Sequence, residues 1–167
     1  MLGYKTMDLS DLLQTFLTAM TPVGELRLSI PRAIYHLHVP WYQALPVSVL
    51  GNMFPVIFII FTLDRIVTLA RRYSSILSRI LDWWISRATR LYTGLYRRHG
   101  ALALIGLVAI PLPLTGAWTG ALVASVFRIR PRTAIPLISL GVIISGIIVT
   151  ALTEAGVQIF VVNGERN

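Results

Sequence analysis

Glu25 and Arg27 are the residues of this chain whose types and spacing best suit chemistry inside a membrane. They lie two positions apart in Thr21-Pro-Val-Gly-Glu-Leu-Arg27, between two apolar stretches. A charge inside a membrane segment costs roughly a few kcal/mol even on lenient scales, and therefore indicates a functional site. In a regular helix the two side chains would point to different sides, but in a broken segment they can converge. We predict that Arg27 binds an anionic group and that Glu25 exchanges a proton or a cation.

A second candidate group lies in Pro111-Leu-Pro-Leu-Thr-Gly-Ala-Trp-Thr-Gly120, at the centre of the apolar segment Ala101–Phe127. Its prolines remove backbone donors and its glycines add backbone freedom, so we expect a helix, a break and a second helix. Thr115 and Thr119 offer hydroxyl groups, Gly116 permits close backbone approach, and Trp118 offers an aromatic wall or a donor. Gly116 and Gly120 also have the Gly-x-x-x-Gly spacing of close helix contacts. The predicted breaks of both groups are Pro22, Gly24, Pro31, Pro111, Pro113 and Gly120.

The alternative for both groups is structural. Glu25 and Arg27 would then be an ion pair that locks the break, and Thr-Gly-Ala-Trp would serve packing. Other chemistry is not indicated: His36 and His38 have no accompanying ligands, so we expect no metal site and no cofactor. No nucleophile and base constellation or phosphate loop is present in the sequence, and we expect that the protein is not an enzyme.

The composition shows which elements must position these residues. Of 167 residues, 55% are hydrophobic, 13% are charged and none is cysteine, which is typical of a small single-domain integral membrane protein. Residues 44–63 and 134–153 are each long and apolar enough to cross a bilayer. Basic residues precede and follow segment 101–127, and such residues favour the cytoplasmic side. We therefore expect a re-entrant hairpin at 101–127 and, by analogy, another at 9–39. Because the arms of 9–39 are more polar, an interfacial helix is the alternative for its first arm.

The net charge of +8 is concentrated in one region. Residues 64–100 contain eight arginines, and four of them lie opposite an apolar face that includes Ile76, Ile80 and Trp84. This pattern predicts a basic amphipathic linker helix on the cytoplasmic membrane surface, in contact with anionic lipid headgroups. A nucleic-acid partner is not expected, because no soluble basic module is present in the sequence.

The chain also contains an internal repeat. Pro22 and Pro40 recur as Pro113 and Pro131 at an offset of 91, and two further positions recur at an offset of 90. Chance recurrence of prolines is the alternative. We predict an all-α membrane fold with an inverted repeat: hairpin 9–39 and helix 44–63 form repeat 9–63, and hairpin 101–127 and helix 134–153 form repeat 101–154. We expect the protein in the inner membrane of a prokaryote. With linker 64–100 in the cytoplasm, both termini should then lie on the outer side of that membrane. Two spanning helices enclose little space, so we expect a homodimer.

Three motifs carry a resemblance to a known family. They are Gly24-Glu-Leu-Arg27 with Ile30-Pro31, then Leu50-Gly-Asn52 with Pro55, then Ile110-Pro-Leu-Pro-Leu-Thr-Gly-Ala-Trp-Thr-Gly-Ala-Leu-Val-Ala124. In this order they resemble the small multidrug export protein family, over nearly the whole chain. That family looks distantly related to the DedA superfamily, and the resemblance implies paired re-entrant hairpins and movement of polyprenyl-phosphate or phospholipid substrates. The arginine-rich DedA motif is missing in its usual form; Arg128, Arg130 and Arg132 are a loose equivalent or simple topology signals.

Three functions therefore remain open. The first is an ion-coupled carrier of an amphiphilic or lipid-linked anion, with Arg27 binding the headgroup between two opposed hairpin tips. The second is a proton-coupled exporter of cationic compounds, with Glu25 exchanging a proton for the cation. The third is a membrane scaffold that transports nothing.

Overall fold

The computed structural model describes residues 6–73, 75–110 and 116–164, and every regular element in these ranges is helical. The chain divides into two compact units. The first contains the residues up to Asn52 together with those from Ile143 onward, and the second is Met53–Val142. Helix α3 (Trp41–Tyr73) begins in the first unit and ends in the second, whereas α7 (Pro131–Gly164) does the reverse.

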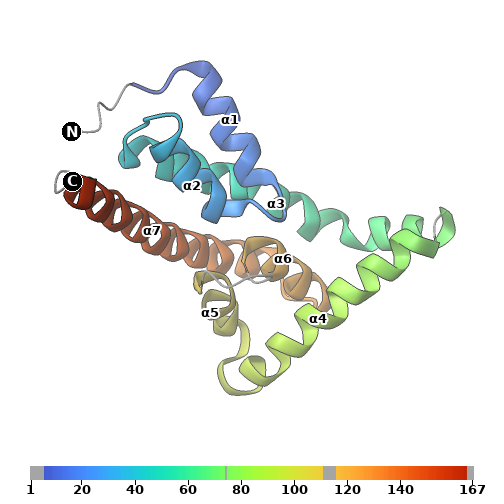
Figure 1. Cartoon of the computed structure of the whole chain (residues 1–167). Helices are drawn as coiled ribbons and strands as arrows, with labels where there is room; N and C mark the ends of the chain where they lie inside the picture. The colour runs from blue at the N-terminus through green and yellow to red at the C-terminus, as the bar shows by residue number, and fades with distance from the viewer. Residues whose placement is uncertain (1–5, 74, 111–115, 165–167) are drawn as a thin grey trace. The chain divides into compact units, whose positions relative to one another are not determined.

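The first unit is built around a pair of short helices, α1 (Leu9–Met20) and α2 (Glu25–Tyr35), which pack side by side (Figure 1). Asp8 caps the start of α1, and its backbone N–H donates to Asp11 Oδ2 at 3.4 Å. The guanidinium of Arg32 donates to Gln14 Oε1 at 3.2 Å, which aligns the two helices. The helix, break and second helix predicted over residues 9–39 are therefore present, with the break at residues 21–24.

The second unit contains α4 (Ser75–His99), a 3-10 turn η1 (Gly100–Leu102), α5 (Ala103–Ala109) and α6 (Ala117–Val126). Tyr92 of α4 connects this helix to the end of α6. Its fully buried ring contacts the Phe127 ring edge-on, with the ring centroids 5.0 Å apart. Its hydroxyl donates to Gly100 O at 3.1 Å. Here too a helix ends at residue 109 and another begins at residue 117, on either side of the predicted break.

Within the described ranges, two helices are long and apolar enough to cross a membrane. The candidate spans are Trp41–Leu63, with a mean hydropathy of 2.1, and Pro131–Gly156, with 2.4. They contain the predicted spans 44–63 and 134–153, so both predictions of membrane-spanning helices agree with the structure. Helix α3 continues to Tyr73, into the predicted linker, because residues 64–73 contain no glycine or proline that would end it. The amphipathic part of the linker is α4.

Helices α3 and α7 bury the same face at an offset of 90 residues. The shared buried positions are Ala44, Ser48, Gly51, Asn52, Pro55, Val56, Ile59 and Leu63 in α3, and Ala134, Ile138, Gly141, Val142, Ser145, Gly146, Val149 and Thr153 in α7. The turn before each helix also repeats. His38 and Arg128 have positive φ angles of 54° and 50°, three residues before α3 and α7 begin. Such φ values are uncommon for residues other than glycine, so their recurrence at one offset reflects the same local fold.

Glycines at equivalent positions allow the long helices to approach the short ones. A Cβ atom on Gly51 would lie 2.6 Å from Phe16 O of α1, and one on Gly141 would lie 2.7 Å from Val108 Cβ of α5. Each long helix therefore packs against the first arm of the hairpin that precedes it in the chain, through a glycine that no larger residue can replace without movement.

Candidate functional site

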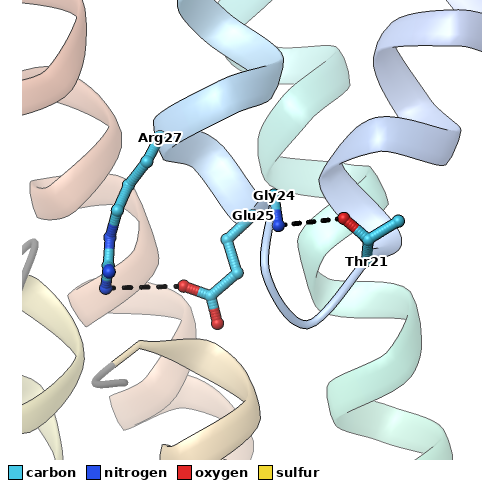
Figure 2. A network of polar contacts seen from close by, with 4 residues as sticks. All are labelled: Thr21, Gly24, Glu25 and Arg27. Atoms are coloured by element: carbon cyan, nitrogen blue, oxygen red, sulfur yellow. Dashed lines mark hydrogen bonds and ion pairs between the residues drawn. The ribbon is translucent and has the colours of Figure 1, made fainter. Parts of the chain in front are cut away.

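The break between α1 and α2 is held by Thr21. The Gly24 N–H donates to Thr21 Oγ1 at 3.0 Å (Figure 2). This hydroxyl in turn donates to Thr18 O at 2.8 Å. The Glu25 N–H donates to Thr21 O at 3.1 Å. The last turn of α1 is therefore tied to the first residue of α2 by three hydrogen bonds. Pro22, a predicted break residue, lies in this turn.

Glu25 and Arg27 converge at the start of α2, as Figure 2 shows. Arg27 Nη2 lies 3.7 Å from Glu25 Oε2. Glu25 has a positive φ of 42°, so it departs from helical geometry, and this departure lets side chains two residues apart meet. The guanidinium side chain is 24% exposed and the carboxylate side chain 8%. The carboxylate is therefore the better shielded of the two charges.

The backbone at this break contributes fewer free donors than expected. Free amides in the first turn of a helix present its positive end to a ligand. At this break, however, Thr21 accepts hydrogen bonds from the amides of both Gly24 and Glu25. The helix dipole favours an anionic group at this end, and Glu25 is the acidic residue in the first turn of α2.

The described part of the second candidate group lies in the second unit. Gly116 precedes α6 with a φ of 126°, a conformation that favours glycine, and Thr119 is buried. Trp118 stacks on Trp84 of α4 with ring centroids 5.8 Å apart and planes 9° from parallel, so its ring serves packing within this unit. Thr115, Pro111 and Pro113 lie outside the described residues. That the two breaks face each other stays a prediction.

Two residues predicted as breaks lie inside helices instead. Pro31 is within α2, where it removes only the helical hydrogen bond to the Arg27 carbonyl, and α2 continues to Tyr35. Gly120 is within α6, where an added Cβ would lie 2.6 Å from Val108 Cγ2. Its role is thus close contact between α6 and α5, which agrees with the Gly-x-x-x-Gly spacing.

Several buried polar residues of the first unit were missed by the sequence analysis. Asp11 is 4% exposed and shares one face of α1 with Thr15 and Ala19. Ser48 and Asn52 occupy the buried face of α3. The available signal was their helical spacing within apolar segments, since residues four apart lie on one side of a helix.

Comparison with known proteins adds a family. Residues 25–148 match the family described as "Putative small multi-drug export protein". The chain belongs to this family. The matched region begins at Glu25 and includes Arg27, the membrane-spanning part of α3, and α4, α5 and α6. The family and the two apolar helices together identify a membrane protein. No curated protein and no solved structure matches the chain. The relationship to DedA proteins stays a prediction.

Proposed function

We propose that this small multidrug export family member is an ion-coupled membrane transporter whose binding centre is the Glu25–Arg27 pair. The observation that carries the proposal is an ion pair 3.7 Å apart at a helix break in an apolar membrane protein. Such charges are expensive to keep in a membrane protein unless they are used or tightly paired. The proposal includes no chemical conversion of the substrate, no cofactor or metal, and no nucleic-acid partner.

An amphiphilic or lipid-linked anion, such as a polyprenyl phosphate or a phospholipid, is the first substrate class. Arg27 supports it, because its guanidinium is the more exposed member of the pair and has five N–H donors, of which a carboxylate uses at most a few. An arriving phosphate would compete with Glu25 for Arg27. Release of Glu25 from the pair would then allow the carboxylate to take up a proton, which couples binding to proton movement.

A cationic amphiphile is the second substrate class, and the family description favours it. In this case the cation displaces Arg27 and pairs with Glu25, whose carboxylate is shielded from water. A shielded carboxylate binds an organic cation more strongly than an exposed one, because the surrounding dielectric is lower. The same pair thus serves either substrate class, and the residue that limits transport differs between them.

Transport measurements on three proteins distinguish these possibilities. Purified wild type, Arg27→Gln and Glu25→Gln would be placed in phosphatidylethanolamine and phosphatidylglycerol vesicles, with and without a pH gradient. For the anion carrier we expect Arg27→Gln to reduce movement of a labelled polyprenyl phosphate at least about tenfold, the effect of losing roughly 1.4 kcal/mol of binding. For the cation exporter, Glu25→Gln should abolish gradient-driven movement of a lipophilic dye cation.

Exposed arginines provide the matched control. Arg32→Gln removes a charge from the same helix α2 but from an exposed side chain, and should leave transport unchanged. If the wild type, shown to be folded, moves neither substrate, the transporter proposal fails and a scaffold role takes its place.

The proposed arrangement is an inverted repeat of two re-entrant hairpins, each followed by a spanning helix. It is supported by the buried faces of α3 and α7 that match at an offset of 90, by the repeated turns at His38 and Arg128, and by the two close-packing glycines. The exposed apolar side chains of Ile76 and Ile80 on α4 favour contact with lipid. We place α4 at the cytoplasmic face of a prokaryotic inner membrane, beside anionic headgroups, with both termini outside.

We further propose that the transporting species is a homodimer. The described part of the chain offers two membrane-spanning candidates, and large apolar side chains such as Leu50, Phe54 and Phe58 are exposed on α3. A second copy would complete the wall around a substrate. Native mass measurement of the protein released from lipid should give twice 18.6 kDa. A single-chain mass, both in detergent and from lipid, would contradict the dimer.

A further inference from the structure

The interior of the first unit contains a group of buried oxygen atoms that have no hydrogen-bond partner within the described ranges. Each belongs to a side chain that is at most 7% exposed, and they come from four helices of one unit. We call these residues the polar interior. They are Thr15 of α1, Ser29 of α2, Ser48 and Asn52 of α3, and Thr150 of α7.

The missing partners are unusual for hydroxyl groups in these helices. Thr18, Ser125 and Thr153 each donate to the carbonyl four residues earlier, at 2.7 to 2.9 Å. That bond is available to almost any helical threonine or serine. The hydroxyls of the polar interior do not make it, although they are buried, and Asn52 Oδ1 can only accept a hydrogen bond.

Contacts between α1 and α2 bring two of these residues to one level. Because the helices are antiparallel and Gln14 lies opposite Arg32, Ser29 lies opposite residue 17, two residues from Thr15. Two residues correspond to about 3 Å along a helix axis. Thr15 and Ser29 are therefore at nearly the same height in the unit.

The long helices contribute their members at the same height. Leu26 packs against Gly146, and the Tyr35 hydroxyl donates to Thr153 O at 2.9 Å, so α2 and α7 run parallel. Ser29 follows Leu26 by three residues, and Thr150 follows Gly146 by four. Ser29 and Thr150 therefore lie at nearly the same height along the helix axes.

Helix α3 aligns with α1 in the same way. Gly51 packs against Phe16 and Ala19, and the Met7 N–H donates to Gln43 Oε1 at 3.0 Å. Along the helix axes, Ser48 of α3 therefore lies within one helical turn of the height of Thr15 of α1. Asn52 follows Ser48 one turn later on the same face of α3. All five residues fall within a short section of one four-helix interior.

The second unit lacks this polarity at the repeated positions. Ser29 corresponds to Gly120 at the offset of 91, and Ser48 and Asn52 correspond to Ile138 and Val142 at the offset of 90. Among the described residues of the second unit, two buried residues carry a hydroxyl: Thr119, and Tyr92, whose hydroxyl donates to Gly100 O. The two halves therefore share a backbone pattern but differ in the chemistry of their interiors.

We infer that the polar interior of the first unit is a binding site for ordered water, and that the second unit is its dry structural counterpart. Buried polar groups without protein partners are satisfied by bound water where several of them converge. Glu25 is the first residue of α2 and lies one turn before Ser29. This water would therefore give protons a route to and from the Glu25 carboxylate. The hydration itself holds whether or not the protein transports; only this last consequence rests on the proposed function.

Cysteine labelling at one repeated position measures the hydration directly, because the chain has no native cysteine. The variants compared are Ser48→Cys and its counterpart Ile138→Cys. Ser48 and Ile138 are both fully buried, and they differ in the interior that surrounds them. A thiol reacts as its thiolate, which forms where water can solvate it, so Ser48→Cys should react with methyl methanethiosulfonate at least about tenfold faster than Ile138→Cys. Equal rates in two proteins with wild-type Tm would overturn the inference.

A pair of threonines on α1 gives a second, independent measurement. If Thr15 binds water, Thr15→Val should lower Tm by roughly a few degrees, because the remaining groups lose a bridging partner. In a dry interior the same change removes an unpaired hydroxyl and should raise Tm, which would count against bound water. Thr18→Val is the control, since Thr18 already donates to Gln14 O and its loss reports only that bond.

Discussion

Arg27→Gln is expected to lower the free energy of unfolding more than the double change of Glu25→Gln with Arg27→Gln. Removing Arg27 alone leaves the Glu25 carboxylate in a site where its side chain is 8% exposed, without its cationic partner at 3.7 Å. Breaking a buried ion pair from one side typically costs about 3–5 kcal/mol, whereas removing both charges is often nearly neutral. Arg27 is 24% exposed, so we expect a cost of roughly 1–3 kcal/mol for the single change.

The measurement is a double-mutant cycle of thermal or denaturant unfolding in one detergent, at a pH where Glu25 is ionised. Arg32→Gln is the control, because its guanidinium is exposed on the same helix and bonds only to the side chain of Gln14 among the contacts described. It should change stability by less than about 1 kcal/mol. If Arg27→Gln were no more destabilising than Arg32→Gln, or if the double change were the worst of the set, the pair would not be the stabilising contact of the break.

The cycle also separates structure from function. A strongly coupled pair with unchanged transport in the folded variants would favour the structural role of Glu25 and Arg27. A pair whose members each limit transport, in variants that remain folded, would favour the binding centre proposed above.

Gly24→Ala should prevent the turn that connects α1 to α2 from forming. An added Cβ would lie 2.4 Å from Thr21 Oγ1 and 2.6 Å from Thr18 O. Both atoms belong to the hydrogen bonds that connect the two helices, so neither can move without breaking one of them. Overpacking of this kind typically costs about 1–3 kcal/mol, and the loss of the turn adds to it. We expect a loss of at least about 2 kcal/mol, with transport lost in parallel.

Gly106 provides the matched control within α5. An added Cβ there would meet no atom within 4 Å, so Gly106→Ala should be neutral or stabilise the protein by about 0.5–1 kcal/mol, the usual gain from glycine to alanine in a helix. Unfolding of both variants in the same detergent checks the prediction. Equal stability of the two would mean that the break adapts to a side chain at position 24.

The helices of this protein were predictable because a membrane-spanning helix requires a long, continuous apolar segment in the sequence. The spans 44–63 and 134–153 follow from length and hydropathy, since the bilayer requires each segment to satisfy its own backbone. The breaks near Pro22 and near Gly116 follow from residues that lack a donor or favour positive φ. Pro31 and Gly120 show the limit of that reasoning, because one lost hydrogen bond or one small residue does not by itself end a helix.

The sequence by itself thus determined the membrane class, the main helices, the regions of both breaks, and the candidates Glu25 and Arg27. Only the tertiary structure decided that these two side chains meet, because their convergence depends on the positive φ of Glu25 and on the turn held by Thr21. It also decided that Trp118 packs on Trp84, and that hydroxyls from four helices gather in one unit. Hydropathy and spacing act along the chain, whereas these contacts join residues far apart in it, and so they depend on how the helices pack.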